Sequence, residues 1–118
     1  MKFFRNFWRR HPQAPLALGR IVVTPAAAMA LERAGLPVQT LLDRHAAGDW
    51  GEVDAVDWRQ NILGLRLGLR VRSAYLLNVE PADHLAPVTC WVITTPNRLT
   101  TMVLLPSEIF NESNNDHE

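Results

Sequence analysis

The stretch VTCWVITTPNRLTTMVLLP, residues 88–106, decides how the rest of the chain is interpreted. Two runs rich in β-branched and apolar residues, 88–95 and 100–106, flank the segment PNRL, whose proline and asparagine favour a tight reversal. Pro106 ends the second run, because proline lacks the backbone donor that a strand needs. The stretch therefore predicts an antiparallel β-hairpin with Arg98 at its tip.

The segments that come before this hairpin predict two more strands. Residues 16–24 end in a β-branched run and predict a short strand. Residues 69–79 alternate between apolar and polar side chains in their first half, which is typical of a half-buried strand. Residues 80–87 then predict a loop.

Three helices are predicted between these strands, because each apolar-periodic segment is bounded by residues that typically start or end a helix. The first segment carries a proline at its first position, where the missing backbone donor does no harm. The third begins with a capping-box arrangement that has Asp in place of Glu. The boundary residues are Thr24, Pro25 and Gly35 for the first helix, Pro37 and Gly48 for the second, and Asp54, Asp57 and Gly68 for the third.

The predicted order is one strand, two to three helices and then an antiparallel meander of three strands. That order is typical of an α+β fold in which helices pack on one face of a sheet. A chain of 118 residues has the usual size of one domain. We place this domain at 16–108, between a basic aromatic arm at 1–15 and an acidic flexible tail at 109–118. An unpaired sheet edge, for which strand 100–106 is the candidate, would allow a homodimer.

Composition limits the classes of function. The formal net charge is zero, so no overall attraction to nucleic acid or acidic lipid is expected. Cys90 is the only cysteine, which excludes an intrachain disulfide and favours a reducing compartment. The apolar runs are too short to cross a bilayer, and the N-terminus is a poor signal peptide. We therefore expect a cytoplasmic protein, and no sequence feature calls for a cofactor.

Within the arm at 1–15, the first ten residues predict a basic amphipathic helix, which Pro12 and Pro15 end. Such a segment can fold back onto the body, lie on a membrane surface, dock on a partner or contact nucleic acid. The residues of the arm that would bind a partner or a membrane are Phe3, Phe4, Arg5, Phe7, Trp8, Arg9 and Arg10.

The segment AGDWGEVDAVDWRQN, residues 47–61, places four acids around two tryptophans. Close carboxylates could perform acid–base chemistry or hold magnesium. However, two of them stand at a predicted helix N-terminus, where a negative charge is favoured by about 0.3–1 kcal/mol, and the spacing of a calcium loop is absent. We therefore interpret the segment as a joint between helices and predict no metal site.

Other candidates for chemistry are few. His45 lies on or near the apolar side of its helix, which favours a hydrogen-bonded core histidine over a metal ligand. Cys90, on a predicted strand, is expected to be buried and inert. Aromatic side chains of a sheet together with an arginine at the hairpin tip could stack on bases and grip phosphate, although threonines there also fit plain strand propensity. The candidate binding residues are Asp49, Trp50, Tyr75, Trp91, Thr94, Arg98 and Thr100.

Four segments within 18–108 resemble one family when they are taken together: LGRIVVTPAAAMALERAG, RHAAGDWGEV, RVRSAYLL and CWVITTPNRLTTMVLLPSE. They are similar to a small, uncharacterised family of proteobacterial proteins carried by plasmids, integrative elements and phages. Its most specific parts are the Gly-Asp-Trp-Gly element at 48–51 and the hairpin, with its Trp-Val-Ile-Thr strand and Leu-Leu-Pro ending. Asn97 departs from the family, whose members usually have an acid there, and the connection at 79–87 is longer than usual. Any activity that depends on that acid is in doubt here.

Members of this family are sometimes labelled as a modification subunit of type I restriction enzymes, but this chain lacks an Asn-Pro-Pro-Tyr type of motif and is too short for a methyltransferase domain. The resemblance instead implies a non-enzymatic binding protein of a mobile genetic element, with a role in counter-defence or maintenance, that docks on a host or element protein. The alternative is a small ribonuclease or RNA-binding protein that resembles RelE-type toxins and barnase-like nucleases. This alternative is an analogy of fold, and its catalytic residues would be Arg98, Tyr75 and His45.

Overall fold

The computed structural model describes residues 16–77 and 87–109, and within them it has the predicted order of elements. The predicted arm, the residues 78–86 and the predicted tail from residue 110 onward lie outside the described residues. A helical turn over 106–109 ends the described chain. The elements are β1 (Arg20–Val23), α2 (Pro25–Ala34), α3 (Val38–Ala46), α4 (Ala55–Leu67), β2 (Val71–Leu77), β3 (Val88–Thr94), the 3-10 turn η2 (Pro96–Arg98) and β4 (Thr100–Leu104).

The first and third predicted helices begin and end at the capping residues that the sequence indicates. The Thr24 side chain accepts a hydrogen bond from the first turn of α2, and Asp54 accepts one from the Asp57 amide at the start of α4. Gly35 and Gly68 adopt the left-handed conformation that ends these helices. Such caps satisfy backbone groups that have no partner inside the helix, which is why a few local residues set the boundaries.

The strands form one mixed sheet in the order β1-β4-β3-β2. The meander is confirmed, with β2 antiparallel to β3 and β3 antiparallel to β4. The prediction that strand 100–106 forms an open edge is wrong, because β1 pairs in parallel with β4 and places it inside the sheet. The two edges are therefore β1 and β2. This pairing joins segments from opposite ends of the domain, and no local pattern encodes it.

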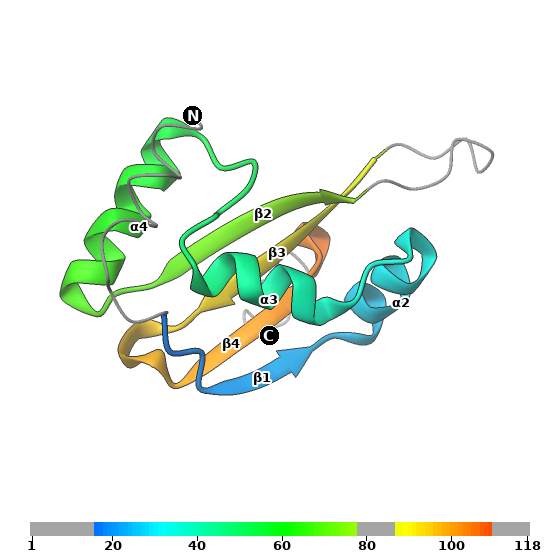
Figure 1. Cartoon of the computed structure of the whole chain (residues 1–118), viewed down its shortest axis with the longest axis horizontal. Coiled ribbons are helices and arrows are strands. Elements are labelled where there is room, and N and C mark those ends of the chain that lie inside the picture. The colour runs from blue at the N-terminus through cyan, green and yellow to red at the C-terminus, as the bar shows by residue number, and fades with distance from the viewer. Residues whose placement is uncertain (1–15, 78–86, 110–118) are drawn as a thin grey trace, which may run out of the picture.

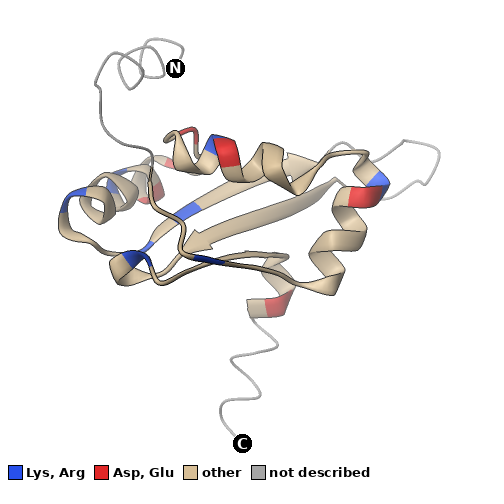
Figure 2. Ribbon diagram, turned by 60° about the horizontal axis from the view of Figure 1, so that its bottom comes forward, with Lys and Arg blue, Asp and Glu red and all other residues tan. Residues whose placement is uncertain are grey.

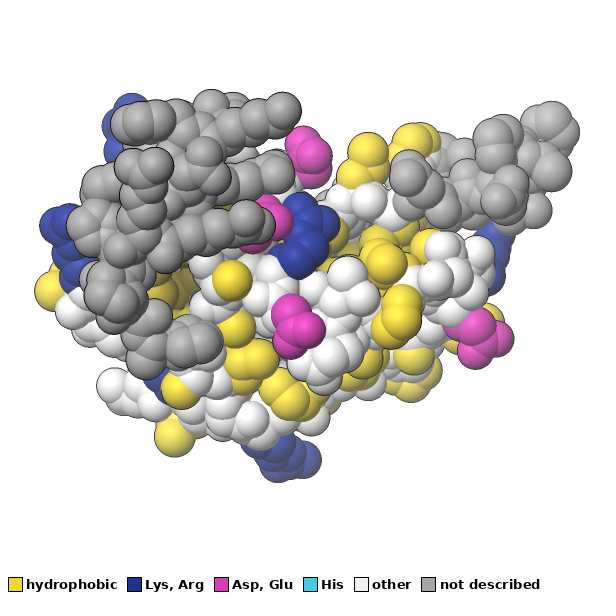
Figure 3. All heavy atoms as spheres, in the orientation of Figure 1, with side chains coloured by type: hydrophobic (Ala, Val, Ile, Leu, Met, Phe, Trp, Pro, Cys, Tyr) yellow, Lys and Arg dark blue, Asp and Glu magenta, His cyan; other side chains and the backbone are white. Residues whose placement is uncertain are grey.

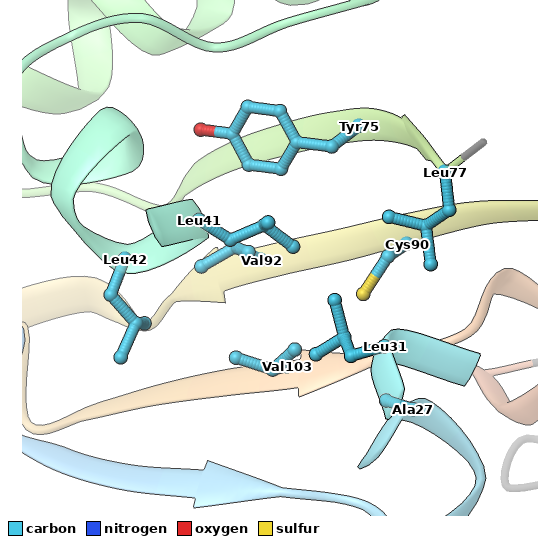
Figure 4. Packing of buried hydrophobic residues seen from close by; sticks show 9 residues of the cluster. All are labelled: Ala27, Leu31, Leu41, Leu42, Tyr75, Leu77, Cys90, Val92 and Val103. Carbon is cyan, nitrogen blue, oxygen red and sulfur yellow. The ribbon is translucent and has the colours of Figure 1, made fainter. Parts of the chain in front are cut away.

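The helices α2 and α3 lie across one face of the sheet, and α4 lies beside β2 (Figure 1). The core fills the space between helices and sheet (Figure 4). Burial raises the pKa of the Cys90 thiol to about 11, so the thiol is protonated and inert, as predicted. Among the helices of the described residues, none combines the length and the apolar character needed to cross a bilayer. The core residues are Ala27, Leu31, Leu41, Leu42, Tyr75, Leu77, Cys90, Val92 and Val103.

Candidate functional site

His45 of α3 is the centre of a buried polar network between this helix and the sheet. Its Nδ1 lies 2.5 Å from Ser73 Oγ of β2, and its Nε2 lies 2.8 Å from Thr94 Oγ1 of β3. Thr94 Oγ1 lies 2.7 Å from Thr101 Oγ1 of β4, which donates to the Leu18 carbonyl just before β1. The network thus connects three strands and the segment that leads into β1, and the histidine is a hydrogen-bonded core residue, as predicted.

Each hydroxyl has one proton, so the direction of the whole network follows from its end. Because Thr101 donates to the Leu18 carbonyl, Thr94 must donate to Thr101 and accept from the Nε2–H of His45. In a neutral ring Nδ1 then carries no proton and accepts from Ser73. Burial, together with a smaller contribution from the nearby charge of Arg98, lowers the pKa of His45 to about 4. The buried imidazole is therefore neutral at neutral pH.

A serine that donates to a histidine is also the arrangement of an activated nucleophile. Here Ser73, His45, Thr94 and Thr101 are all completely buried, so a substrate cannot reach the serine in this conformation. The second imidazole nitrogen contacts a threonine in place of a carboxylate that would stabilise an imidazolium. The geometry thus serves packing and polar satisfaction. Sequence reasoning missed the partnership because these residues are distant along the chain.

The acid-rich segment is a joint between α3 and α4, in agreement with the interpretation above. Asp49 forms an ion pair with Arg44 at 2.9 Å, and its carbonyl accepts a hydrogen bond from the Tyr75 hydroxyl at 2.7 Å. Trp50 is buried and packs edge-to-face on Trp58, with ring centroids 6.1 Å apart. The two acids at the start of α4 have structural roles as well: Asp54 caps the helix, and Asp57 forms an ion pair with Arg72. No group of three or more His, Cys, Asp or Glu in the described part of the chain is placed to hold a metal ion.

Arg98 does not project freely from the hairpin tip. Its guanidinium donates to the Leu69 carbonyl at 2.5 Å and to the Gly64 carbonyl at 2.6 Å, which lies in the last turn of α4. A cation at this position also complements the negative end of the helix. The arginine therefore ties the hairpin tip to α4.

The residues proposed for catalysis or binding do not form one accessible site. Tyr75 is 1% exposed on the helix-covered face, and burial raises its pKa. Trp91 lies on the opposite face, where the Arg72 guanidinium stacks on its ring at 4.4 Å. Thr100 is half-buried beside Arg20 in the parallel pair. The helix-covered face shows acidic and basic side chains interspersed among its described residues (Figure 3).

Exposed apolar side chains on α4 and the hairpin tip are a better candidate for a contact site. Val56, Leu63 and Leu67 are separated by seven and four residues, so they lie along one side of α4. Their exposed fractions are 62%, 47% and 65%. Leu69, after the helix, and Leu99, after Arg98, are also exposed, and the bonds of Arg98 hold these two segments together. We call these five residues the α4 patch.

Three exposed arginines lie close in sequence to residues of the α4 patch. Arg59 and Arg66 are exposed on α4, three residues after Val56 and Leu63, and Arg70 is exposed next to Leu69. Exposed apolar side chains that cluster with a polar border are typical of protein contact surfaces. Sequence reasoning missed the patch because α4 carries apolar residues on its buried and its exposed sides. Periodicity alone therefore could not separate the two sides.

Comparison with known proteins gives no relative: the chain matches no protein-family model, and no curated protein and no solved structure is significantly similar to it.

Proposed function

We propose that this chain is a non-enzymatic accessory protein of a mobile genetic element that docks onto a host or element protein through the α4 patch. The exposure of the patch leucines carries the proposal, since Leu67 and Leu99 are 65% and 70% exposed. Burial of apolar side chains like these is the main favourable term in protein association. The resemblance to proteins of plasmids, integrative elements and phages supplies the biological setting, for which counter-defence or maintenance is the proposed role.

The chemistry of the patch also defines the partner. An apolar centre bordered by Arg59, Arg66 and Arg70 fits a protein surface with an apolar ridge and acidic residues around it. Opposite charges at the border would orient the partner and speed its association more than they would tighten binding.

The test is capture of partners from lysate of the host with three forms of the tagged chain. The double variant Leu67→Glu/Leu99→Glu places charges in the α4 patch without touching the core. Met29→Glu is the matched control, because Met29 is 67% exposed on α2, outside the patch. We expect one stoichiometric partner with the wild type and with Met29→Glu, and its loss with the double variant. No stoichiometric partner, or equal capture by all three forms, would contradict the proposal.

The ribonuclease alternative has less support. His45 and Tyr75 are buried, and Arg98 already binds two backbone carbonyls. Incubation of the purified chain with labelled total RNA, with and without magnesium, tests it directly. Cleavage that disappears in both Arg98→Ala and Tyr75→Phe would replace the docking proposal, whereas intact and unshifted RNA is the expected result.

A further inference from the structure

The outer edge of β1 has the features of a strand-pairing site. The amides of Arg20 and Thr24 donate to the β4 side, to Leu99 and Val103, both at 3.0 Å. Because backbone groups alternate in direction along a strand, those of Ile21 and Val23 point away from β4. Among the described residues these outward groups have no hydrogen-bond partner. No other described element lies beside this edge (Figures 1 and 2).

We propose that the β1 edge pairs with the β1 edge of a second copy of this chain, in antiparallel orientation, to form a continuous sheet across a two-fold axis. A two-fold axis makes the contact self-complementary, which is the usual symmetry of homodimers. The inference does not involve the α4 patch and stands apart from the proposed function.

The register of this pairing follows from the chain itself. If the axis passes at Val22, the outward groups of Ile21 meet those of the partner's Val23, and each of these two symmetric pairs exchanges two hydrogen bonds. A register that sets Ile21 against itself would pair Val23 with Gly19, whose φ of 64° is incompatible with a continued strand. A register that sets Val23 against itself would pair Ile21 with Pro25, which has no amide and begins α2. The register centred on Val22 therefore makes the most hydrogen bonds.

Side chains agree with this register. It brings Ile21, which is 41% exposed, against a valine of the other copy on the helix-covered face. It also sets Arg20 opposite Thr24 of the other copy on the other face. Thr24 Oγ1 donates to the Glu108 carboxylate at 2.8 Å, so each Arg20 guanidinium would lie beside a carboxylate of the other copy. Within the described residues Arg20 has no carboxylate partner of its own.

Sedimentation velocity on the full chain over a concentration series tests whether the dimer exists. We expect a reversible monomer–dimer equilibrium. Ile21→Pro removes an outward donor and leaves the bonds between β1 and β4 intact, because proline is tolerated where the amide faces away from the sheet. It should raise the dimer Kd about tenfold or more, with an unchanged circular dichroism spectrum. Arg20→Glu, an exposed change that puts like charges together, should raise the Kd about threefold.

Disulfide trapping tests the register independently of folding effects. Two copies of Val22 would face each other in a pair without hydrogen bonds, with Cα atoms about 4.5 Å apart, which a disulfide can bridge. Val22→Cys should therefore give a covalent dimer on mild oxidation. Ile21→Cys is the control, because its two copies would be diagonal and out of reach. The native Cys90 is buried and does not compete.

Three results would overturn the proposal: a wild-type chain that stays monomeric at every concentration, a dimer that Ile21→Pro leaves unchanged, or Ile21→Cys cross-linking as readily as Val22→Cys. A monomer that instead binds a strand of another protein at this edge falls under the first of these results.

Discussion

The two edge strands of the sheet, β2 and β1, differ in whether their outward backbone groups have hydrogen-bond partners. At the β2 edge, the Asn61 side chain donates to the Arg72 carbonyl at 2.7 Å and accepts from the Arg72 amide at 2.9 Å. Two residues on, the Ala74 amide donates to the Trp50 carbonyl, and the Ala74 carbonyl accepts from the Glu52 amide. The β1 edge has no such cover among the described residues.

An unpaired strand edge can pair with a strand of another chain, and proteins commonly cover the edges that must not do so. Here a single asparagine on α4 and the joint after α3 imitate a neighbouring strand along β2. The acid-rich joint therefore has a clear structural task, which is to close one edge and leave β1 as the edge that can pair. The buried network from Ser73 to Leu18 connects these two sides beneath the sheet.

The largest expected effect comes from the joint at Gly51. Its φ is 71°, and an added Cβ would overlap the Ala74 carbonyl and the Tyr75 ring. Gly51→Ala should lower the free energy of unfolding by about 3–4 kcal/mol, from left-handed strain of about 1–2 kcal/mol and two lost backbone hydrogen bonds of about 1 kcal/mol each. Urea unfolding measures this change.

Gly35→Ala is the matched control for Gly51→Ala. Gly35 has a similar φ of 66°, but an added Cβ would meet nothing within 4 Å. Only the conformational strain remains, so the loss should be about 1–2 kcal/mol. If the two variants lose equal stability, the joint does not depend on its close approach to β2.

Acid should weaken the network that joins the two sides of the sheet. The pKa of His45 falls from 6.5 to about 4 on folding, so between these values the unfolded chain binds a proton that the folded chain does not. The resulting stability is complete above pH 6.5 and is lost as the pH falls toward 4. The loss should reach about 3 kcal/mol, at 1.36 kcal/mol per pKa unit.

Urea unfolding of the wild type and of His45→Gln at several pH values isolates this contribution. The variant should be less stable at neutral pH, because glutamine cannot reproduce both imidazole contacts. Its stability should then depend less on pH between 6.5 and 4. Parallel curves for the two proteins would show that His45 is not the group that titrates.

A smaller effect than those at Gly51 and His45 is expected at Asn61. Asn61→Ala leaves the amide and carbonyl of Arg72 without their partners, which should cost about 2 kcal/mol of stability. Gln60→Ala, an exposed neighbour on α4, should stay within about 0.5 kcal/mol of the wild type. Hydrogen exchange of the Arg72 amide should accelerate in Asn61→Ala and stay unchanged in Gln60→Ala. An unaccelerated Arg72 amide would mean that the edge is closed by something other than Asn61.

The sequence by itself determined the local parts of this protein. The caps at Thr24, Asp54, Gly35 and Gly68, the reversal at PNRL and the core position of His45 all followed from residues a few positions apart. These features are local because a helix end or a turn satisfies its backbone groups with its nearest neighbours.

Only the tertiary structure decided which strand forms the edge, which hydroxyls surround His45 and where Arg98 points. Those outcomes depend on which segments from distant parts of the chain meet when the apolar faces of α2 and α3 are buried against the sheet. From sequence alone, an arginine at a turn could equally well bind a phosphate or donate to the last carbonyls of a helix. The carbonyls of Gly64 and Leu69 become its partners only because folding brings α4 beside the hairpin tip.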